Sequence, residues 1–222
     1  MKKKLIIKKF ENFSNDTIEI NNSEYNRYIN SNKTDYGKVA WGTQANQIKN
    51  YKLIAKNINS GDSILDFGCG LGDLIGYLTN NNINISNYTG VDINNNFIKL
   101  AKNKYPNYNF SLIKDVGNIL GNWDIVCAIG VFTWYITKDE FIDTIKKLYS
   151  LSNKHLLITL LNANSEGTPY NQEYYTEEDE EDFWSEYYRE YDSELFNKLF
   201  PELSHKMKFE YVNNTILVKI SK

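Results

Sequence analysis

Along the middle of the chain, segments with the apolar pattern of buried strands alternate with segments that have the apolar spacing of helices. Short apolar runs, typical of buried strands, occupy residues 64–67, 88–93, 108–113, 123–131 and 155–161. Apolar residues at the three- and four-residue spacing of amphipathic helices lie between them, over residues 73–80, 96–104 and 138–151. Strands that alternate with helices in this way predict an α/β fold with a mostly parallel sheet.

The two ends of the chain follow other patterns. Residues 40–58 predict a helix before the first strand, and residues 193–199 predict one after the fifth. The last apolar runs, 206–212 and 215–220, are separated by a short polar turn and predict an antiparallel hairpin. Residues 1–32 are polar with little periodicity, and we expect a small hairpin or an ordered arm there.

The length, composition and net charge of the chain limit the classes of protein to which it can belong. A chain of 222 residues with 41% hydrophobic residues is long enough for one domain with a core. The net charge of -3 favours neither nucleic acid nor a membrane as partner. The lysine-rich start precedes only three apolar residues, too few for a secretion signal, and no run is long enough to span a membrane. Cys69 and Cys127 lack neighbours at metal-ligand spacing, so we expect a reducing, cytoplasmic setting.

The residues that suggest a ligand site lie where the first two predicted strands end. The first strand runs into Asp66-Phe67-Gly68-Cys69-Gly70-Leu71-Gly72-Asp73, and the second ends in Asp92. A tight strand-to-helix loop, followed about twenty residues later by an acid, places a nucleoside-containing ligand at the carboxyl edge of the sheet. A dinucleotide site would need a glycine where Asp73 stands, and a carboxylate there would repel a pyrophosphate. A loop that serves packing alone and a nicotinamide or flavin site are the alternatives.

This loop, with Asp66 before it and Asp92 after it, resembles that of the class I S-adenosylmethionine-dependent methyltransferases. The resemblance implies an α/β, Rossmann-like, doubly wound sheet of about seven strands, mostly parallel with a C-terminal antiparallel hairpin. It implies that residues 1–222 form a single methyltransferase domain. Its expected parts are an N-terminal arm or lid and helix (1–58), a cofactor-binding core (60–162), a substrate-side insertion (163–200) and the hairpin (201–222).

The resemblance also implies roles for the loop residues. Gly68, Cys69, Gly70 and Gly72 would pass under the amino-acid tail of S-adenosylmethionine, and Asp66 would lie close to that tail. Asp92 would hold the two ribose hydroxyls, with Ile93 packing on the adenine.

Further cofactor contacts are implied at other strand ends. Asp115, after the third strand, would bond the adenine amino group, and Val116 would offer a backbone N–H to the ring. The alternative for Asp115 is a turn-forming role. Ile129 would run beside the methionine part of the cofactor. Trp41 and Gln44 would belong to a lid over the cofactor, unless this segment only packs at the N-terminus, and Thr43 is a candidate helix N-cap.

The sequence says less about which residues would bind the methyl acceptor. Phe132-Thr133-Trp134-Tyr135 follow the fourth strand, and aromatic faces receive a sulfonium methyl well. Tyr135 is the candidate catalytic residue, with its hydroxyl near the acceptor; packing under the next helix is the alternative. Residues 164–194 interleave tyrosines with acids, which predicts either an acidic, aromatic wall for a sugar or an amine, or a solvated helix.

Together these features predict a methyltransferase that acts on a small polar molecule, at oxygen or nitrogen, by in-line transfer governed by positioning. His155 and His205 are expected to be structural or exposed, and a metal-free enzyme is predicted. Nucleic acid is disfavoured as substrate because the acidic residues 164–194 would repel phosphates and the motifs of DNA methyltransferases are absent. An RNA or protein acceptor, or a non-catalytic S-adenosylmethionine-binding subunit, is the alternative. The oligomeric state is not predicted.

Overall fold

A seven-stranded sheet forms the centre of the protein, with strand order β3-β2-β1-β4-β5-β7-β6. The computed structural model describes residues 13–132, 136–162 and 191–222. The strands are β1 (Ser63–Phe67), β2 (Asn87–Asp92), β3 (Asn109–Leu112), β4 (Trp123–Ile129), β5 (Ser152–Leu161), β6 (Met207–Val212) and β7 (Thr215–Ser221). Strands β1 to β5 are parallel, whereas β7 runs antiparallel to β5 and β6. The predicted Rossmann-like sheet with its antiparallel hairpin is therefore confirmed.

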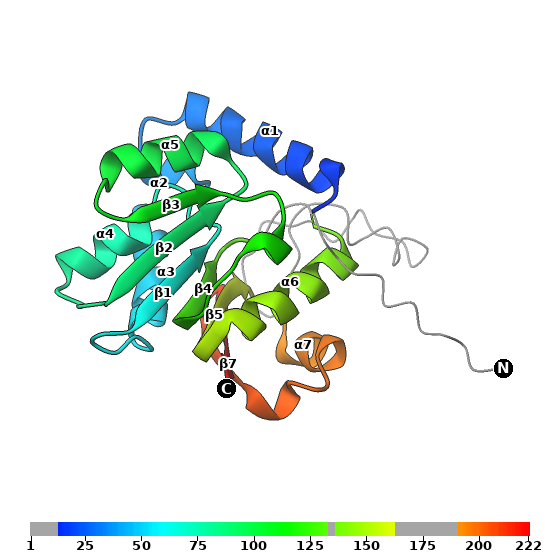
Figure 1. Ribbon diagram of the computed structural model, residues 1–222. Coiled ribbons are helices and arrows are strands. Elements are labelled where there is room, and N and C mark those ends of the chain that lie inside the picture. Colours follow the sequence, from blue (N-terminus) through cyan, green and yellow to red (C-terminus); the bar gives the residue numbers. More distant parts are fainter. Residues whose placement is uncertain (1–12, 133–135, 163–190) are drawn as a thin grey trace.

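Helices cover both faces of this sheet (Figure 1). They are α1 (Asn15–Ser31), α2 (Asp35–Lys38), α3 (Gln44–Ala55), α4 (Asp73–Asn80), α5 (Asn95–Lys104), α6 (Lys138–Leu151) and α7 (Ser193–Leu199). Because successive strand residues point to opposite faces, β1 contributes to two cores. Its Ile64 packs in the cluster with α3, α4 and α5, and its Leu65 packs in the cluster with α6 and α7.

Several elements begin and end where the sequence predicts. Helices α4, α6 and α7 have the predicted bounds, and Thr43 is the N-cap of α3 as expected. The helix predicted over residues 40–58 is shorter, because residues 35–38 form α2 and Ala40 has a φ of 61°. A positive φ is incompatible with a right-handed helix, so α3 begins only after this residue.

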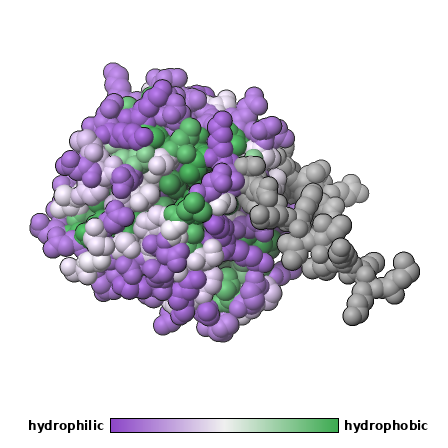
Figure 2. All heavy atoms as spheres, viewed as in Figure 1, coloured by the Kyte–Doolittle hydropathy of each residue, from purple (hydrophilic) through white to green (hydrophobic). Residues whose placement is uncertain are grey.

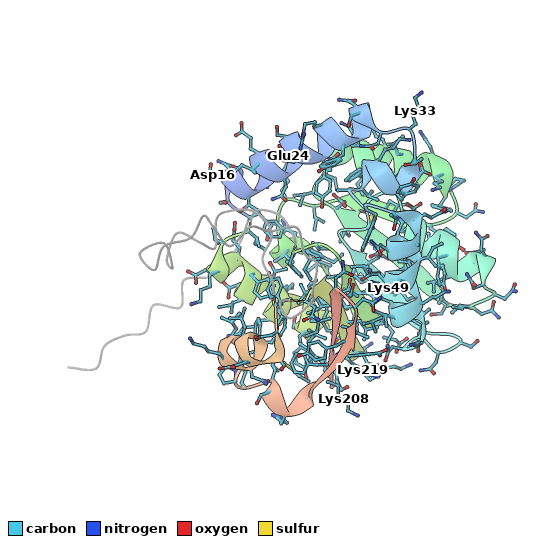
Figure 3. The ribbon with its side chains drawn as sticks, turned by 180° about the vertical axis from the view of Figure 1, so that it is seen from behind. Asp16, Glu24, Lys33, Lys49, Lys208 and Lys219 are labelled. Atoms are coloured by element: carbon cyan, nitrogen blue, oxygen red, sulfur yellow. The ribbon has the colours of Figure 1, made fainter. Side chains whose placement is uncertain are left out.

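Of residues 1–32, for which a small hairpin or an ordered arm was expected, the described part contains a helix and no hairpin. Residues 15–31 form the 17-residue helix α1, which starts at the N-cap Ser14, whose side chain accepts from the backbone N–H of Thr17. Figure 1 shows α1 lying across the molecule beside α5 and α2. Its outward positions are polar, as Asp16 shows in Figure 3. The region therefore forms one side of the structure and covers part of the sheet's carboxyl edge.

Hydrophilic side chains dominate the face seen in Figure 2, with a band of apolar side chains near its middle. In the described part of the chain, no helix is long and apolar enough to cross a membrane.

Of the expected insertion, residues 163–190 lie outside the described ranges. Its remaining residues return to the core, where Tyr191, Phe196 and Phe200 are buried.

Candidate functional site

A cavity of about 860 Å³ lies at the carboxyl ends of β1, β2, β4 and β5. Its floor consists of the residues at and after these strand ends, including Asp66, Asp92, Ile129 and Thr159. Its roof consists of residues from just before α1 to the middle of α3: Phe13, Thr17, Asn21, Tyr25, Tyr28, Asn32, Thr34, Tyr36, Gly37, Val39, Ala40, Trp41, Gly42, Asn46, Asn50 and Tyr51. This is the position at which open α/β sheets bind ligands, and the volume is typical of a small-molecule site.

The loop between β1 and α4 is pinned to the end of β2. The backbone N–H groups of Gly68 and Cys69 both donate to the carbonyl of Val91, at 2.8 and 3.0 Å. The next N–H, that of Gly70, donates to the Asp92 carboxylate at 2.9 Å. Because these three donors are already used inside the protein, this stretch of the loop does not offer the free N–H groups that a pyrophosphate requires.

Two glycines let the roof approach the floor closely. Gly70 has a φ of 52°, and a Cβ built on it would lie 2.9 Å from Cγ1 of Val39. Gly130, just after β4, has a φ of 65°, and a Cβ there would lie 3.2 Å from the Trp41 ring. Any side chain at either position would both strain the backbone and push on the roof. Trp41 therefore lies over the carboxyl end of β4 and lines the cavity, as its proposed lid role requires.

Asp92 is buried beside the glycine loop. Its Oδ2 accepts from Gly70 N–H, and its Oδ1 accepts from Asn94 N–H at 2.8 Å. Burial raises the pKa of this carboxyl to about 6, although the backbone hydrogen bonds act to lower it. The carboxyl thus lies in the cavity wall, where burial disfavours its negative charge and the two backbone N–H donors offset only part of this effect.

Asp66 lies in the cavity wall on the neighbouring strand and is also buried. The Tyr88 hydroxyl donates to its Oδ2 at 2.5 Å, and the Cys127 thiol lies 3.8 Å from its Oδ1. Burial, and to a smaller extent the nearby Asp92, raise the pKa of Asp66 to about 7, while the Tyr88 hydrogen bond opposes this shift. Two carboxyls with raised pKa values therefore meet at one end of the glycine loop.

Apolar and aromatic groups line the cavity next to Asp92. They are Ile93, Phe97 and Ile113 from the sheet side and Tyr25 and Tyr28 from α1. The rings of Tyr25 and Phe97 pack edge to face with centroids 5.3 Å apart. This combination of a flat apolar surface beside a carboxylate suits a heteroaromatic ring attached to a hydroxyl-bearing group.

The roof is fastened to the sheet side by ion pairs and amide contacts. Lys104, at the end of α5, contacts Asp35 of α2 at 2.7 Å and Asp73 of α4 at 2.5 Å. The hydrogen bond from Lys104 lowers the pKa of Asp35. Nearer the middle of α1, Asn26 accepts from the side chains of Asn94 and Asn96. These contacts hold α1 and α2 over the loop that follows β2.

The structure brings most of the predicted cofactor residues together. Asp66, Gly68, Cys69, Gly70, Asp92, Ile93, Ile129 and Trp41 all line the cavity. Their individual roles are still predictions. Tyr135, the candidate catalytic residue, lies outside the described residues.

Four predicted residues do not line the cavity in the described part of the chain. Gly72 is the N-cap of α4, and Gln44 is exposed in the first turn of α3. Asp115 turns back to accept from the backbone N–H of Gly117 at 2.6 Å, the turn-forming alternative. Val116 packs in the core with α6 and α7.

The prediction from sequence also missed lining residues. Thr17, Asn21, Tyr25 and Tyr28 of α1 face the cavity, and they recur at the four- and three-residue spacing of one helix face. That spacing was the available signal. Asn46 and Asn50, one turn apart on α3, line the cavity where Gln44 was expected.

The described lining contains Asp66, Asp73 and Asp92 but no lysine, arginine or histidine. On α3, Lys49 instead reaches Asn214 in the β6–β7 hairpin, at 2.9 Å (Figure 3). Across the described ranges, no group of three or more His, Cys, Asp or Glu side chains is arranged to hold a metal. The cavity therefore presents carboxyls, amides, hydroxyls and aromatic rings.

Residues 65–151 match the family model of a methyltransferase domain. Protein 235L of Invertebrate iridescent virus 6, provisionally named a methyltransferase, is 28% identical over 136 residues, which cover 60% of this chain and 50% of that protein. The chain thus spans about half the length of this curated relative.

Two solved structures share the fold. Magnesium protoporphyrin IX methyltransferase (ChlM) from Synechocystis PCC 6803, with bound SAH, has a TM-score of 0.60 at 14% identity, over 93% of this chain and 99% of that one. DhpI in its SAH complex has a TM-score of 0.65 at 12% identity, over 93% and 97% of the two chains. At such low identity, these similarities establish the fold.

Proposed function

We propose that this chain, whose residues 65–151 match the family model of a methyltransferase domain, is a class I S-adenosylmethionine-dependent methyltransferase that transfers a methyl group from S-adenosylmethionine to a small polar acceptor. The observation that carries the proposal is the pair of buried carboxyls, Asp66 and Asp92, beside the glycine loop in a roofed cavity at the carboxyl edge of the sheet.

The residues present fit this cofactor. Burial raises the pKa values of Asp66 and Asp92 to about 7 and about 6, so an adjacent cationic ligand would stabilise the ionised form of both carboxyls and would lower both pKa values. Asp92 would hold the ribose hydroxyls, and Ile93 with Tyr25 would pack on the adenine. Gly68 and Gly70 keep the loop free of side chains below the amino-acid tail, near Asp66.

Bound S-adenosylmethionine supplies a methyl group activated on a sulfonium. The chain's own contribution is to position the two reactants and exclude water. The carboxyl ends of β1 and β2 would hold one reactant, and residues 13–42 would cover it from above. Holding acceptor and methyl in line within about 3–3.5 Å supplies a large part of the acceleration of such a displacement.

The lining supports a neutral or cationic acceptor. A phosphate or carboxylate acceptor would lie among three carboxyls with no lysine, arginine or histidine in the described lining to receive it. Residues 163–190 are also strongly acidic in sequence, with ten acidic residues and one arginine. We therefore favour an amine or a neutral hydroxyl over a nucleic acid. Free Cys69 and Cys127 support a reducing, cytoplasmic setting.

The test is incubation with S-adenosylmethionine labelled on the methyl group and an extract separated into small-molecule, RNA, DNA and protein fractions. We expect label in the small-molecule fraction, retained by cation exchange if the acceptor is an amine. Label found only in RNA, DNA or protein would contradict the proposed acceptor class. Binding of S-adenosylhomocysteine with no labelled product in any fraction would instead support the non-catalytic subunit.

A further inference from the structure

Glu140 is a buried carboxylate with no ion-pair partner among the described residues. Its side chain is only 4% exposed. Burial acts to raise the pKa of Glu140, but hydrogen bonds from Ser14, Thr137 and Thr17 outweigh it and hold the pKa below the usual value. Loss of any of these donors would leave part of the cost of burying the charge without compensation.

The two oxygens of Glu140 serve two different helices. Its Oε2 accepts from the backbone N–H of Thr137 at 2.9 Å, and the Thr137 hydroxyl accepts in turn from Glu140 N–H, which completes the capping box of α6. Its Oε1 accepts from the backbone N–H of Ser14, the N-cap of α1, at 2.6 Å. The two bonded residues are 126 positions apart in the chain.

Helix α1 cannot close a capping box with its own residues. A capping box needs a Glu or Gln at the third helical position, whose side chain reaches back to the N-cap N–H. In α1 that position is Thr17, which is too short and instead donates its hydroxyl to Oε2 of Glu140 at 2.7 Å. Glu140 therefore supplies from α6 the carboxylate that α1 lacks.

This contact lies at one end of the cavity. Thr17, which Glu140 holds, lines the cavity, and so do its neighbours Phe13 on the α1 side and Ile136 just before α6. The Phe13 and Phe67 rings pack at 6.4 Å, so the start of α1 lies against the carboxyl end of β1. Displacement of the first turn of α1 would therefore move part of the cavity wall.

We propose that Glu140 is a positioning residue that caps α1 and α6 at once and thereby fixes the roof helix over the ligand cavity. Glu140 need not touch the ligand in this role. It acts through Ser14 and Thr17 on the face of α1 that carries Asn21, Tyr25 and Tyr28. The capping role stands on the geometry alone, and only its effect on a ligand rests on the proposed function.

The test combines hydrogen exchange with calorimetry on the full chain. In Glu140→Gln one carboxylate oxygen is replaced by an NH2 donor, so the backbone N–H groups of Ser14 and Thr137 can no longer both be accepted. We expect backbone exchange in residues 15–31 to accelerate about tenfold or more, corresponding to about 1.4 kcal/mol, and the Kd of S-adenosylhomocysteine to rise severalfold. The second variant, Thr17→Val, leaves the α6 box intact and should accelerate exchange in α1 but not in α6.

The matched control is Asp192→Ala, which removes the N-cap of α7, where Asp192 accepts from Leu195 N–H at 2.7 Å. It should lower stability to a similar degree without changing exchange in residues 15–31 or ligand affinity. Unchanged exchange in residues 15–31 in both Glu140→Gln and Thr17→Val, or equal acceleration in Asp192→Ala, would overturn the proposal. If the unaltered protein binds no S-adenosylhomocysteine, the proposed function fails, while the exchange comparison still decides the role of Glu140.

Discussion

Asp66 and Asp92 are two buried carboxyls in the wall of the cavity, and the pKa of each is raised. Each belongs to a parallel strand in the middle of the sheet, and burial is the main cause of its raised pKa. Their neighbours differ: a tyrosine hydroxyl donates to Asp66, whereas backbone N–H groups donate to Asp92. The two acids are thus fixed in place before any ligand arrives, at a cost in stability that depends on pH.

This cost gives a prediction for Asp66. Above pH 3.8 its carboxyl ionises in the unfolded chain, but in the folded protein it keeps its proton up to about pH 7. The folded state binds more protons in this window, so the contribution of Asp66 to stability is greatest below about pH 4 and falls as the pH rises toward 7. Urea denaturation of the ligand-free protein between pH 4.5 and 7.5 should show this decline.

In Asp66→Asn, whose amide oxygen still accepts from Tyr88, the decline should be smaller by roughly 2–4 kcal/mol across the window. All other carboxyls are the same in both proteins, so the difference between the two curves belongs to Asp66. Parallel curves for the two proteins would contradict the raised pKa.

Residue roles were only partly predictable from the sequence. The acids flanking the glycine loop could be placed because short apolar runs mark the two strands that carry them, and both acids line the cavity. Asp115 also follows a strand, but its side chain accepts from Gly117 N–H. An aspartate after a strand suits either a ligand or a turn, and the spacing is the same in both cases.

At the scale of elements, the α/β core was predictable and α1 was not. The core elements bury apolar runs, which give a clear period. In α1 the inward face is formed by Thr17, Asn21, Tyr25 and Tyr28, which are polar or amphipathic because they face a cavity. The helix depends on Glu140, which is distant in the chain, and a local pattern does not reveal such a contact.

The close approach of roof and floor predicts the effect of a methyl group at Gly70. Gly70→Ala adds the left-handed strain of about 1–2 kcal/mol and a Cβ 2.9 Å from Cγ1 of Val39. We expect a loss of about 2–4 kcal/mol in the free energy of unfolding, measured by urea denaturation, together with weaker binding of S-adenosylhomocysteine.

The control is Gly61→Ala, at a φ of 86° with no atom within 4 Å of the added Cβ. It should show the strain of about 1–2 kcal/mol alone and leave ligand affinity unchanged. Equal losses of stability in the two variants would mean that the roof does not press on the glycine loop.

At the scale of the whole molecule, the main cavity lies between the carboxyl edge of the sheet and the roof residues that cover it. Among the described residues, contacts that hold the roof come from Glu140 at the start of α1, from Asn94 and Asn96 near its middle, and from Lys104 beside α2. These residues lie in α6, in α5 or directly before α5, and both helices flank the sheet. A ligand bound at the carboxyl edge of the sheet would therefore contact both the strand ends and the roof. A small ligand in this cavity would lie between the strand ends and the roof.

The central claim is that this cavity binds S-adenosylmethionine through the acid at the end of β2. Titration calorimetry with S-adenosylhomocysteine tests it most directly, with Asp92→Asn as the variant and Asp115→Asn as its control. The amide oxygen that replaces the carboxylate in Asp92→Asn can still accept from Gly70 N–H, so the loop keeps this contact. Asp115 is an acid after the end of β3 that does not line the cavity.

We expect micromolar binding to the unaltered protein and to Asp115→Asn, and binding weaker by about tenfold to a hundredfold in Asp92→Asn. No binding to the unaltered protein, or equal affinity in all three proteins, would contradict the account.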